Sequence, residues 1–132
     1  MIDSLKLDNQ LCFPLYACSK EIIRKYKKYL DEIDLTYTQY IVMMVMWENK
    51  QLKISELGKK IYLDSGTLTP LLKKLETKGY IDRIRDKDDE RNVIIKLTSK
   101  GDSLKDKAKS IPNKMGSCIN LEKDEAAFLY KI

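Results

Sequence analysis

The chain has 132 residues, a length that suits one domain with its own hydrophobic core. Apolar residues make up 43% and charged residues 34% of it, which is the balance of a folded globular protein and excludes a disordered one. Lysine and arginine number 25 against 20 acidic residues, and the net charge of +5 favours a polyanionic partner without demanding one.

No segment has the character of a membrane span, a secretory signal or a metal site. The longest apolar run, residues 40–47, is far shorter than a bilayer requires, and residues 1–11 are too polar for a signal peptide. The three cysteines do not cluster and histidine is absent, so the sequence has no zinc-binding pattern. We therefore expect a cytoplasmic protein with free thiols, no membrane partner, no metal and no cofactor.

The first predicted element is a helix from Asn9 to Leu30, where apolar residues recur at three- and four-residue intervals. Pro14 fits a helix only near its start, because deeper inside it would remove a backbone hydrogen bond and clash with the preceding turn. Cys12 is therefore expected in or beside the first turn of this helix.

Two more helices follow. Thr36 and Gln39 form a capping-box pattern in front of the apolar run 40–47, which predicts the start of a helix that is buried on most sides. Residues 54–62 carry apolar side chains on one face only, and they predict a short amphipathic helix.

A tight polar turn at residues 63–66 leads to a fourth helix, which carries four leucines on one face. Gly79 is placed to end this helix in the left-handed conformation. Pro70 lies inside it, and we therefore expect its regular part to start late.

A β-hairpin comes next. Residues 80–85 and 91–97 alternate apolar and polar side chains, and the charged run 86–90 between them suits an exposed loop. Thr98 then caps a helix that runs toward Ile111, where Pro112 interrupts it.

The C-terminal part is less regular. Residues 113–120 show no clear period, and a last helix begins near Leu121 and is still running at Ile132.

This order of short helix, tight turn, second helix and hairpin is that of a winged helix-turn-helix. We predict a mainly α (α+β) fold in a single domain, 1–132, whose residues 36–97 form the winged helix-turn-helix. Residues 5–33 and 99–132 would supply N- and C-terminal helices for dimerisation.

Four segments, residues 9–16, 35–40, 62–76 and 89–93, combine a cysteine at a helix start, a Gly-Thr-Leu-Thr-Pro helix and an Asp-Glu-Arg hairpin loop. In these segments the sequence resembles the MarR family of transcriptional regulators, and within it the organic hydroperoxide resistance regulator group. The resemblance implies a homodimeric repressor that binds a pseudo-palindromic operator in double-stranded DNA. It also implies release of that DNA when organic hydroperoxide oxidises Cys12.

The resemblance departs from the family pattern at the C-terminus, where family members continue the last helix further. Either this sequence is shortened, or the dimer relies more on the first and fifth helices.

The helix after the tight turn presents hydroxyl and basic side chains opposite its leucines. In a winged helix this element enters the major groove, where small hydroxyl residues approach the DNA closely and lysines neutralise phosphate charge. The alternative is an ordinary amphipathic helix with a solvated basic face. The candidate contacts are Ser65, Thr67, Thr69, Lys73 and Lys74.

The hairpin adds candidates, although its carboxylates cancel its positive charge. The resemblance implies that Arg91 enters the minor groove, where narrow grooves attract arginine, while Asp89 orients it by an ion pair. The alternative is a solvated hairpin tip. The candidates in the hairpin are Arg83, Arg85, Lys87, Asp89 and Arg91. The other carboxylates, which cancel positive charge, are Asp82, Asp86, Asp88 and Glu90.

Cys12 is the candidate redox sensor. A thiol reacts with peroxide as the thiolate, which a helix N-terminus and phenolic hydroxyls stabilise. Tyr16 lies one turn later on the same face, whereas Tyr26 is about 21 Å away along a straight helix and cannot reach this thiol in its own chain. The resemblance implies that Tyr26 and Tyr37 of the partner subunit donate to Cys12. The alternative is a small buried cysteine among tyrosines that pack a dimer interface.

Cys118 is a candidate resolving cysteine. The irregular stretch after Pro112 would let it move and condense with a sulfenic acid at Cys12 of the partner subunit, a route that some members of the resembled group take. The alternative is a stray thiol in a loop. Cys18 lies on the opposite face of the first helix from Cys12, and we interpret it as structural.

Three other functions compete with a redox-gated repressor. One is a repressor of the same type that is released by a small phenolic or aromatic ligand. A second is a thiol peroxidase, against which the absence of arginine or histidine near Cys12 in the sequence argues. A third is a nucleoid protein with little sequence preference. We favour the regulator and expect no enzymatic activity.

Overall fold

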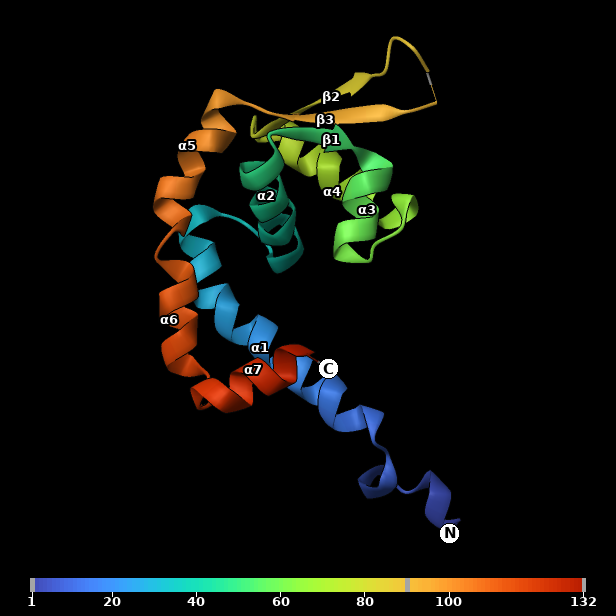
Figure 1. Ribbon diagram of the computed structural model, residues 1–132, viewed down its shortest axis with the longest axis vertical. Helices are drawn as coiled ribbons and strands as arrows, with labels where there is room; N and C mark the ends of the chain where they lie inside the picture. Colours follow the sequence, from blue (N-terminus) through green and yellow to red (C-terminus); the bar gives the residue numbers. More distant parts are fainter. Residues whose placement is uncertain (1, 90, 132) are drawn as a thin grey trace. The chain divides into compact units, whose positions relative to one another are not determined.

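The computed structural model describes residues 2–89 and 91–131; Met1, the predicted wing carboxylate Glu90 and the C-terminal Ile132 lie outside the described residues. The chain divides into two units (Figure 1). One unit holds the residues up to Tyr29 together with those from Lys109 onward, and the other holds Leu30–Ala108.

The Leu30–Ala108 unit contains the predicted helix-turn-helix and hairpin, which confirms the winged-helix fold. A 3₁₀ turn at Asp31–Ile33 precedes its first full helix. Its elements in chain order are α2 (Tyr37–Asn49), β1 (Gln51–Lys53), α3 (Ile54–Ile61), α4 (Ser65–Thr77), β2 (Ile81–Arg85), β3 (Val93–Leu97) and α5 (Ser99–Ala108).

The predicted capping box at the start of α2 is present. The backbone N–H of Gln39 donates to Thr36 Oγ1 at 3.3 Å, and the backbone N–H of Thr36 donates to Gln39 Oε1 at 3.0 Å. These bonds satisfy donors that a helix start leaves without a partner. The rest of α2 is largely removed from water and supplies Tyr40, Val42, Met43 and Met46 to the core.

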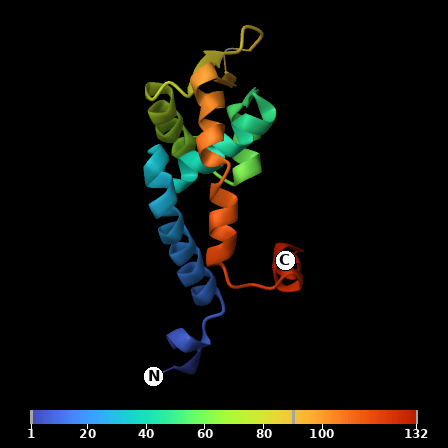
Figure 2. The same cartoon turned by 90° about the vertical axis from the view of Figure 1, so that its left-hand side faces the viewer.

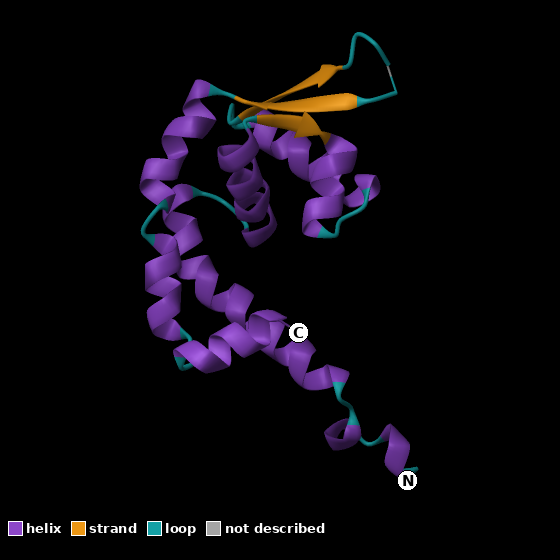
Figure 3. Cartoon of the chain, in the orientation of Figure 1, coloured by secondary structure: helices purple, strands orange, loops and turns teal. Residues whose placement is uncertain are grey.

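The sheet has three antiparallel strands in the order β1-β3-β2, packed on one side of α2, α3 and α4 (Figure 3). In its register, Ile95 of β3 lies opposite Leu52 of β1 and Arg83 of β2. The hairpin β2–β3 is the predicted wing. Strand β1 was not predicted, because three residues are too few to show an alternating pattern.

Helix α4 begins earlier than its sequence indicates. Pro70 predicts a late start, but the helix runs from Ser65, so this prediction is wrong. The reason is the side chain of Asp64, which caps the helix by accepting a bond from the backbone N–H of Thr67 at 2.8 Å. At its other end, Gly79 has the predicted left-handed conformation, with φ at 84°.

Helix α5 packs closely against the start of β2. Thr98 caps it as predicted, since its Oγ1 accepts from the backbone N–H of Gly101 at 3.0 Å. The carbonyl oxygen of Gly101 accepts a bond from Trp47 Nε1 at 2.9 Å. A Cβ on Gly101 would lie 2.1 Å from the carbonyl oxygen of Tyr80, so only glycine permits this approach.

The other unit is helical. Helix α1 runs from Cys12 to Leu30, and α6 (Ile111–Cys118) and α7 (Lys123–Lys131) come from the C-terminal part. The cartoons show α6 alongside α1 (Figures 1 and 2), and Tyr29 of α1 contacts both Lys114 and Cys118 of α6.

The prediction of an irregular stretch at residues 113–120 is wrong for most of its length, because α6 occupies it. Pro112 interrupts the predicted helix as expected, but it then stands in the first turn of a new one, where proline costs no hydrogen bond.

No helix among residues 2–89 and 91–131 is long and apolar enough to cross a membrane.

Replacing Gly101 by alanine should destabilise the Leu30–Ala108 unit. The added methyl group would meet the Tyr80 carbonyl and also Leu97 Cδ1 at 2.8 Å, so α5 must shift away from the sheet. We expect a loss of about 2–3 kcal/mol in the free energy of unfolding, measured by urea denaturation at a fixed protein concentration. Gly66→Ala is the control, because its nearest contact would be Asp64 Oδ1 at an ordinary 3.5 Å. Equal denaturation midpoints for the two variants would contradict this packing.

Candidate functional site

The N-terminal turn of α4 is exposed, and the leucines on the opposite face of the helix anchor it in the core. Leu68, Leu72 and Leu75 are fully buried, while Ser65 and Thr67 face solvent on the opposite side. Thr69 is half-buried, and its hydroxyl donates to the carbonyl oxygen of Ser65 at 2.8 Å. The predicted hydroxyl face is therefore available to a ligand at Ser65 and Thr67, and partly at Thr69.

The turn before α4 depends on a glycine in α3. A Cβ on Gly58 would lie 2.6 Å from the carbonyl oxygen of Leu63 and 3.3 Å from Leu68 Cδ1. Because Gly58 has no side chain, α3 and α4 approach closely. Tyr62 ends α3 in the left-handed conformation, and its side chain is 93% exposed.

The capping carboxylate of Asp64 is held in its ionised form. The backbone N–H of Thr67 and then its hydroxyl donate to it, and they lower the pKa of Asp64 below its usual value.

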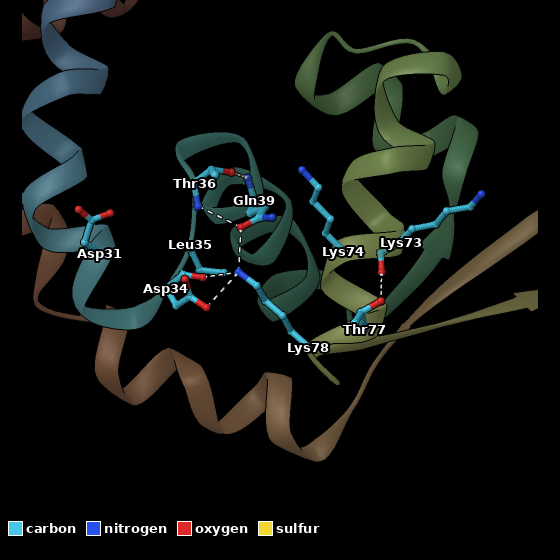
Figure 4. A pocket seen from close by; sticks show the side chains of 9 residues that line it. All are labelled: Asp31, Asp34, Leu35, Thr36, Gln39, Lys73, Lys74, Thr77 and Lys78. Carbon is cyan, nitrogen blue, oxygen red and sulfur yellow. Dashed lines mark hydrogen bonds and ion pairs between the residues drawn. The ribbon is translucent and has the colours of Figure 1, made fainter.

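The two lysines predicted to contact phosphate point in different directions. Lys74 reaches into the space between the start of α2 and α4, whereas Lys73 extends away on the other side of α4 (Figure 4). Both are exposed. A hollow of about 500 Å³ lies here, lined by Asp31, Asp34, Leu35, Thr36, Gln39, Lys73, Lys74, Thr77 and Lys78.

At the wing, Arg91 and Asp89 form the expected ion pair. Arg91 Nε and Nη2 donate to the two carboxylate oxygens at 3.2 and 3.4 Å, and the backbone N–H of Arg91 donates to Oδ1 at 3.1 Å. These bonds lower the pKa of Asp89. The Arg91 side chain is nevertheless 91% exposed, so Asp89 orients it without removing it from water.

The other basic residues of the hairpin differ in their surroundings. Arg85 and Lys87 are exposed. Arg83 is half-buried, and its Nε and backbone N–H donate to the carboxylate of Glu76 near the end of α4 at 3.3 and 3.2 Å. This predicted DNA contact therefore ties the wing to α4.

A second hollow, of about 300 Å³, joins the start of α4 to the wing. It brings together three predicted residues from separate elements, Ser65, Thr69 and Arg91. Lys53 and Ser55 also line it, and sequence reasoning missed both. The only local signal was the polar start of the short helix 54–62, which does not reveal what lies opposite.

The predicted sensor Cys12 is the first residue of α1 and is exposed in the single chain. Tyr16 stands one turn later, with its side chain 58% exposed and Lys20 Nζ 5.3 Å from the centre of its ring. Tyr26 lies half-buried further along the same helix. Tyr37 is the first residue of α2 and belongs to the other unit.

Cys118 is not in an irregular stretch. It is the last residue of α6, and its Sγ lies 3.6 Å from the hydroxyl oxygen of Tyr29. Cys118 and Cys18 are both exposed. No group of three or more histidine, cysteine or acidic side chains among the described residues is arranged to hold a metal ion.

Comparison with known proteins places this geometry in a family. The family model described as transcriptional regulator SarA/Rot matches residues 24–108. The organic hydroperoxide resistance transcriptional regulator of Bacillus subtilis is 45% identical over 130 residues, which are 98% of this chain and 86% of that protein. The HTH-type transcriptional regulator SarZ of Staphylococcus saprophyticus is 52% identical over 120 residues, 91% of this chain and 82% of that one.

Among solved structures, AbfR of Staphylococcus epidermidis is similar in three states. Reduced AbfR bound to DNA has a TM-score of 0.82 at 34% identity, and covers 98% of this chain and 90% of its own. Overoxidized AbfR bound to DNA has a TM-score of 0.80 at 33% identity with the same coverage. The disulfide-formed protein has a TM-score of 0.69 at 33% identity, with 98% and 93% covered.

The fold, with its exposed α4 and wing, is that of a winged helix-turn-helix regulator. The chain belongs to the SarA/Rot family of transcriptional regulators, which confirms the MarR-type resemblance in the sequence. It is a regulator and not an enzyme.

The cap of α4 should make stability depend on acid. Folding lowers the pKa of Asp64, so its contribution is complete above the usual value of 3.8 and is lost as pH falls through the lowered folded value. Asp64→Asn keeps a capping side chain without the charge, and should lose less stability than wild type between about pH 5 and pH 2. Urea denaturation at each pH measures this. Asp106→Asn removes an exposed carboxylate from α5 as a control, and parallel profiles for all three proteins would count against the cap.

Proposed function

We propose that the protein is a homodimeric repressor that binds double-stranded DNA through α4 and the wing, and releases it when organic hydroperoxide oxidises Cys12. The observation that carries the redox part is the exposed thiol at the first residue of α1, in a chain 45% identical to an organic hydroperoxide resistance regulator. Acting on DNA, the protein would work in the cytoplasm.

The proposed DNA surface joins the start of α4 to the wing. Ser65 and Thr67 would approach base edges and phosphates in the major groove, with Lys73 and Lys74 neutralising phosphate. Arg91, oriented by Asp89, would enter the minor groove beside it. The shared hollow of Ser65, Thr69 and Arg91 supports one continuous surface, and the DNA-bound state of AbfR supports its use. Arg85 and Lys87 would add phosphate contacts, whereas Arg83 would act through Glu76.

The proposed dimer uses residues 5–33 and 99–132, and leaves 36–97 to read DNA. Large apolar side chains of these segments are exposed in the single chain, and burying them would stabilise a two-fold dimer. Two α4 helices would then read a pseudo-palindrome with half-sites about one helical turn apart. The apolar side chains include Leu5, Leu7, Leu11, Phe13, Leu15, Phe128 and Leu129.

The proposed chemistry begins with the Cys12 thiolate. Its sulfur attacks the peroxide oxygen that carries the proton, the O–O bond breaks and cysteine sulfenic acid forms, while the alkoxide leaves and takes a proton from water to become the alcohol. Tyr16, together with Tyr26 and Tyr37 of the partner subunit, would donate hydrogen bonds to this sulfur at the start of α1.

Cys118 would be the second thiol. Its attack on the sulfenic sulfur would form a disulfide and release water. Cys118 ends α6 beside Tyr29, and the disulfide would need its α-carbon to come within about 7 Å of that of the partner's Cys12. The disulfide form of AbfR supports such a route in a relative.

Cys12→Ser should separate the redox mechanism from release by a small ligand. We expect this variant to bind DNA as the wild type does. One equivalent of cumene hydroperoxide should lower the DNA affinity of the wild type and leave that of the variant unchanged. Electrophoretic mobility shift on a duplex selected from a random library measures both. Release of Cys12→Ser by the hydroperoxide would refute the proposed sensor. In the same samples, a covalent dimer on a non-reducing gel that is lost in Cys118→Ser would identify the second thiol.

Arg91→Ala should weaken binding to the selected duplex by about 1–3 kcal/mol and reduce discrimination against random DNA, because it removes a minor-groove contact. Lys74→Ala should weaken specific and random binding alike and lower the salt dependence. Fluorescence anisotropy titrations at several salt concentrations distinguish the two patterns. Lys107→Ala, which removes an exposed charge from α5, is the control. Wild-type affinity in Arg91→Ala would show that the wing does not read DNA.

A further inference from the structure

Lys78 joins three segments of the Leu30–Ala108 unit at the C-terminal end of α4. Its ammonium group donates to the backbone carbonyl of Asp34 and lies 3.5 Å from Asp34 Oδ2 (Figure 4). It also donates to Gln39 Oε1 at 3.4 Å. The carbonyl oxygen of Lys78 in turn accepts from Lys100 Nζ of α5 at 2.8 Å. One residue therefore connects the end of α4 to the segment before α2, to α2 itself and to α5.

Its partners are well placed to hold it. The Lys78 side chain is only 27% exposed, so its charge is partly desolvated and depends on these acceptors. The ion pair with the Asp34 carboxylate contributes little, because that carboxylate is 91% exposed. The other two acceptors are the backbone carbonyl of Asp34 and the side-chain amide oxygen of Gln39, and Gln39 is 97% buried.

Gln39 has two tasks at once. The oxygen that accepts from Lys78 also accepts the backbone N–H of Thr36 in the capping box of α2. The first residue of α2, between these two, is Tyr37. A displacement of Tyr37 thus moves the first turn of α2. The cap of this turn and Lys78 share one acceptor, Gln39 Oε1.

A surface hollow lies where α2 begins beside α4. The hollow of about 500 Å³ occupies this place, and Lys78, Asp34 and Gln39 are among its lining residues. The bonds of Lys78 to Asp34 and Gln39 therefore cross from the end of α4 to the start of α2 at the margin of this hollow.

We infer that Lys78 is a positioning residue that couples the first turn of α2 to the DNA-reading helix α4. When the turn at Tyr37 moves, the shared acceptor and the Asp34 carbonyl move with it, and Lys78 shifts the end of α4. The extension of this coupling to oxidation rests on the proposed function, in which Tyr37 donates a hydrogen bond to Cys12 of the partner subunit. The coupling itself is a property of this unit and requires no oxidation.

The test that is independent of redox uses amide hydrogen exchange on the reduced, full-length protein. Binding of the selected duplex to α4 should slow exchange in residues 36–41 of the wild type, because coupling between two sites is reciprocal. Lys78→Met keeps an unbranched apolar stem but no donor, and should reduce that slowing by about 2- to 30-fold. Lys78→Arg, which keeps donors and charge, should restore it. Lys107→Met controls for the loss of one positive charge.

Two outcomes of this experiment would overturn the inference. One is equal slowing in wild type and Lys78→Met at saturating DNA. The other is no slowing at residues 36–41 in the wild type. A purely stabilising role would lower the melting temperature of Lys78→Met but leave the DNA-dependent change in exchange intact.

A second measurement links the coupling to oxidation. The ratio of DNA dissociation constants for oxidised and reduced protein should be smaller in Lys78→Met than in wild type, while the rate of Cys12 oxidation stays the same. A ratio of one in the wild type would refute the proposed redox function, and the exchange experiment would still decide the coupling. An unchanged ratio in Lys78→Met would refute the role of Lys78 in release.

Discussion

Leu68, Leu72 and Leu75 lie on one face of α4 without access to water, and the other arrangements of the winged-helix unit depend on this burial. Each leucine stabilises the fold by about 1.5–3 kcal/mol through removal of apolar surface from water. The burial also sets the rotation of α4 about its axis. Ser65 and Thr67 must then face outward, and the Asp64 cap must stand at the edge of the turn. A surface that reads DNA follows from the way the opposite surface packs.

The same helix is positioned at both ends by other parts of the chain. Gly58 lets α3 approach its start, while Arg83 binds Glu76 near its end and Lys78 reaches Asp34 and Gln39. The wing and the segment before α2 therefore both form hydrogen bonds with residues at the C-terminal end of α4. A regulator needs such connections, because a signal changes DNA affinity only by shifting an element that has two arrangements.

The thiol part of the molecule is organised differently. Cys12 is exposed at the start of α1, and the apolar side chains near it are exposed as well. In the proposed dimer these side chains would become buried, and the surroundings of Cys12 would be completed by residues of the partner subunit. Sensing and dimerisation would then share one surface.

Local patterns in the sequence were sufficient for much of the fold. The capping box of Thr36 and Gln39, the left-handed Gly79 and the alternating strands of the wing involve residues a few positions apart, so their physical causes are visible in a short window. The exposed hydroxyl face of α4 was predictable for the same reason, whereas the Asp89–Arg91 pair was implied by the family resemblance. The family resemblance supplied the roles of Cys12, Tyr26 and Tyr37, which no periodicity reveals.

Tertiary structure alone decided what depends on residues far apart in the chain. Strand β1 is too short to be recognised, and it exists because Leu52 finds Ile95 across the sheet. Pro112 could either end one helix or start another. In the folded chain it starts α6, which contacts Tyr29 through Lys114 and Cys118. Lys78 is an ordinary charged residue at a helix end until folding brings Asp34 and Gln39 within reach. The sequence by itself determined the local elements and the face that α4 exposes; packing between distant segments decided which polar side chains became anchors, because their partners meet only in the folded chain.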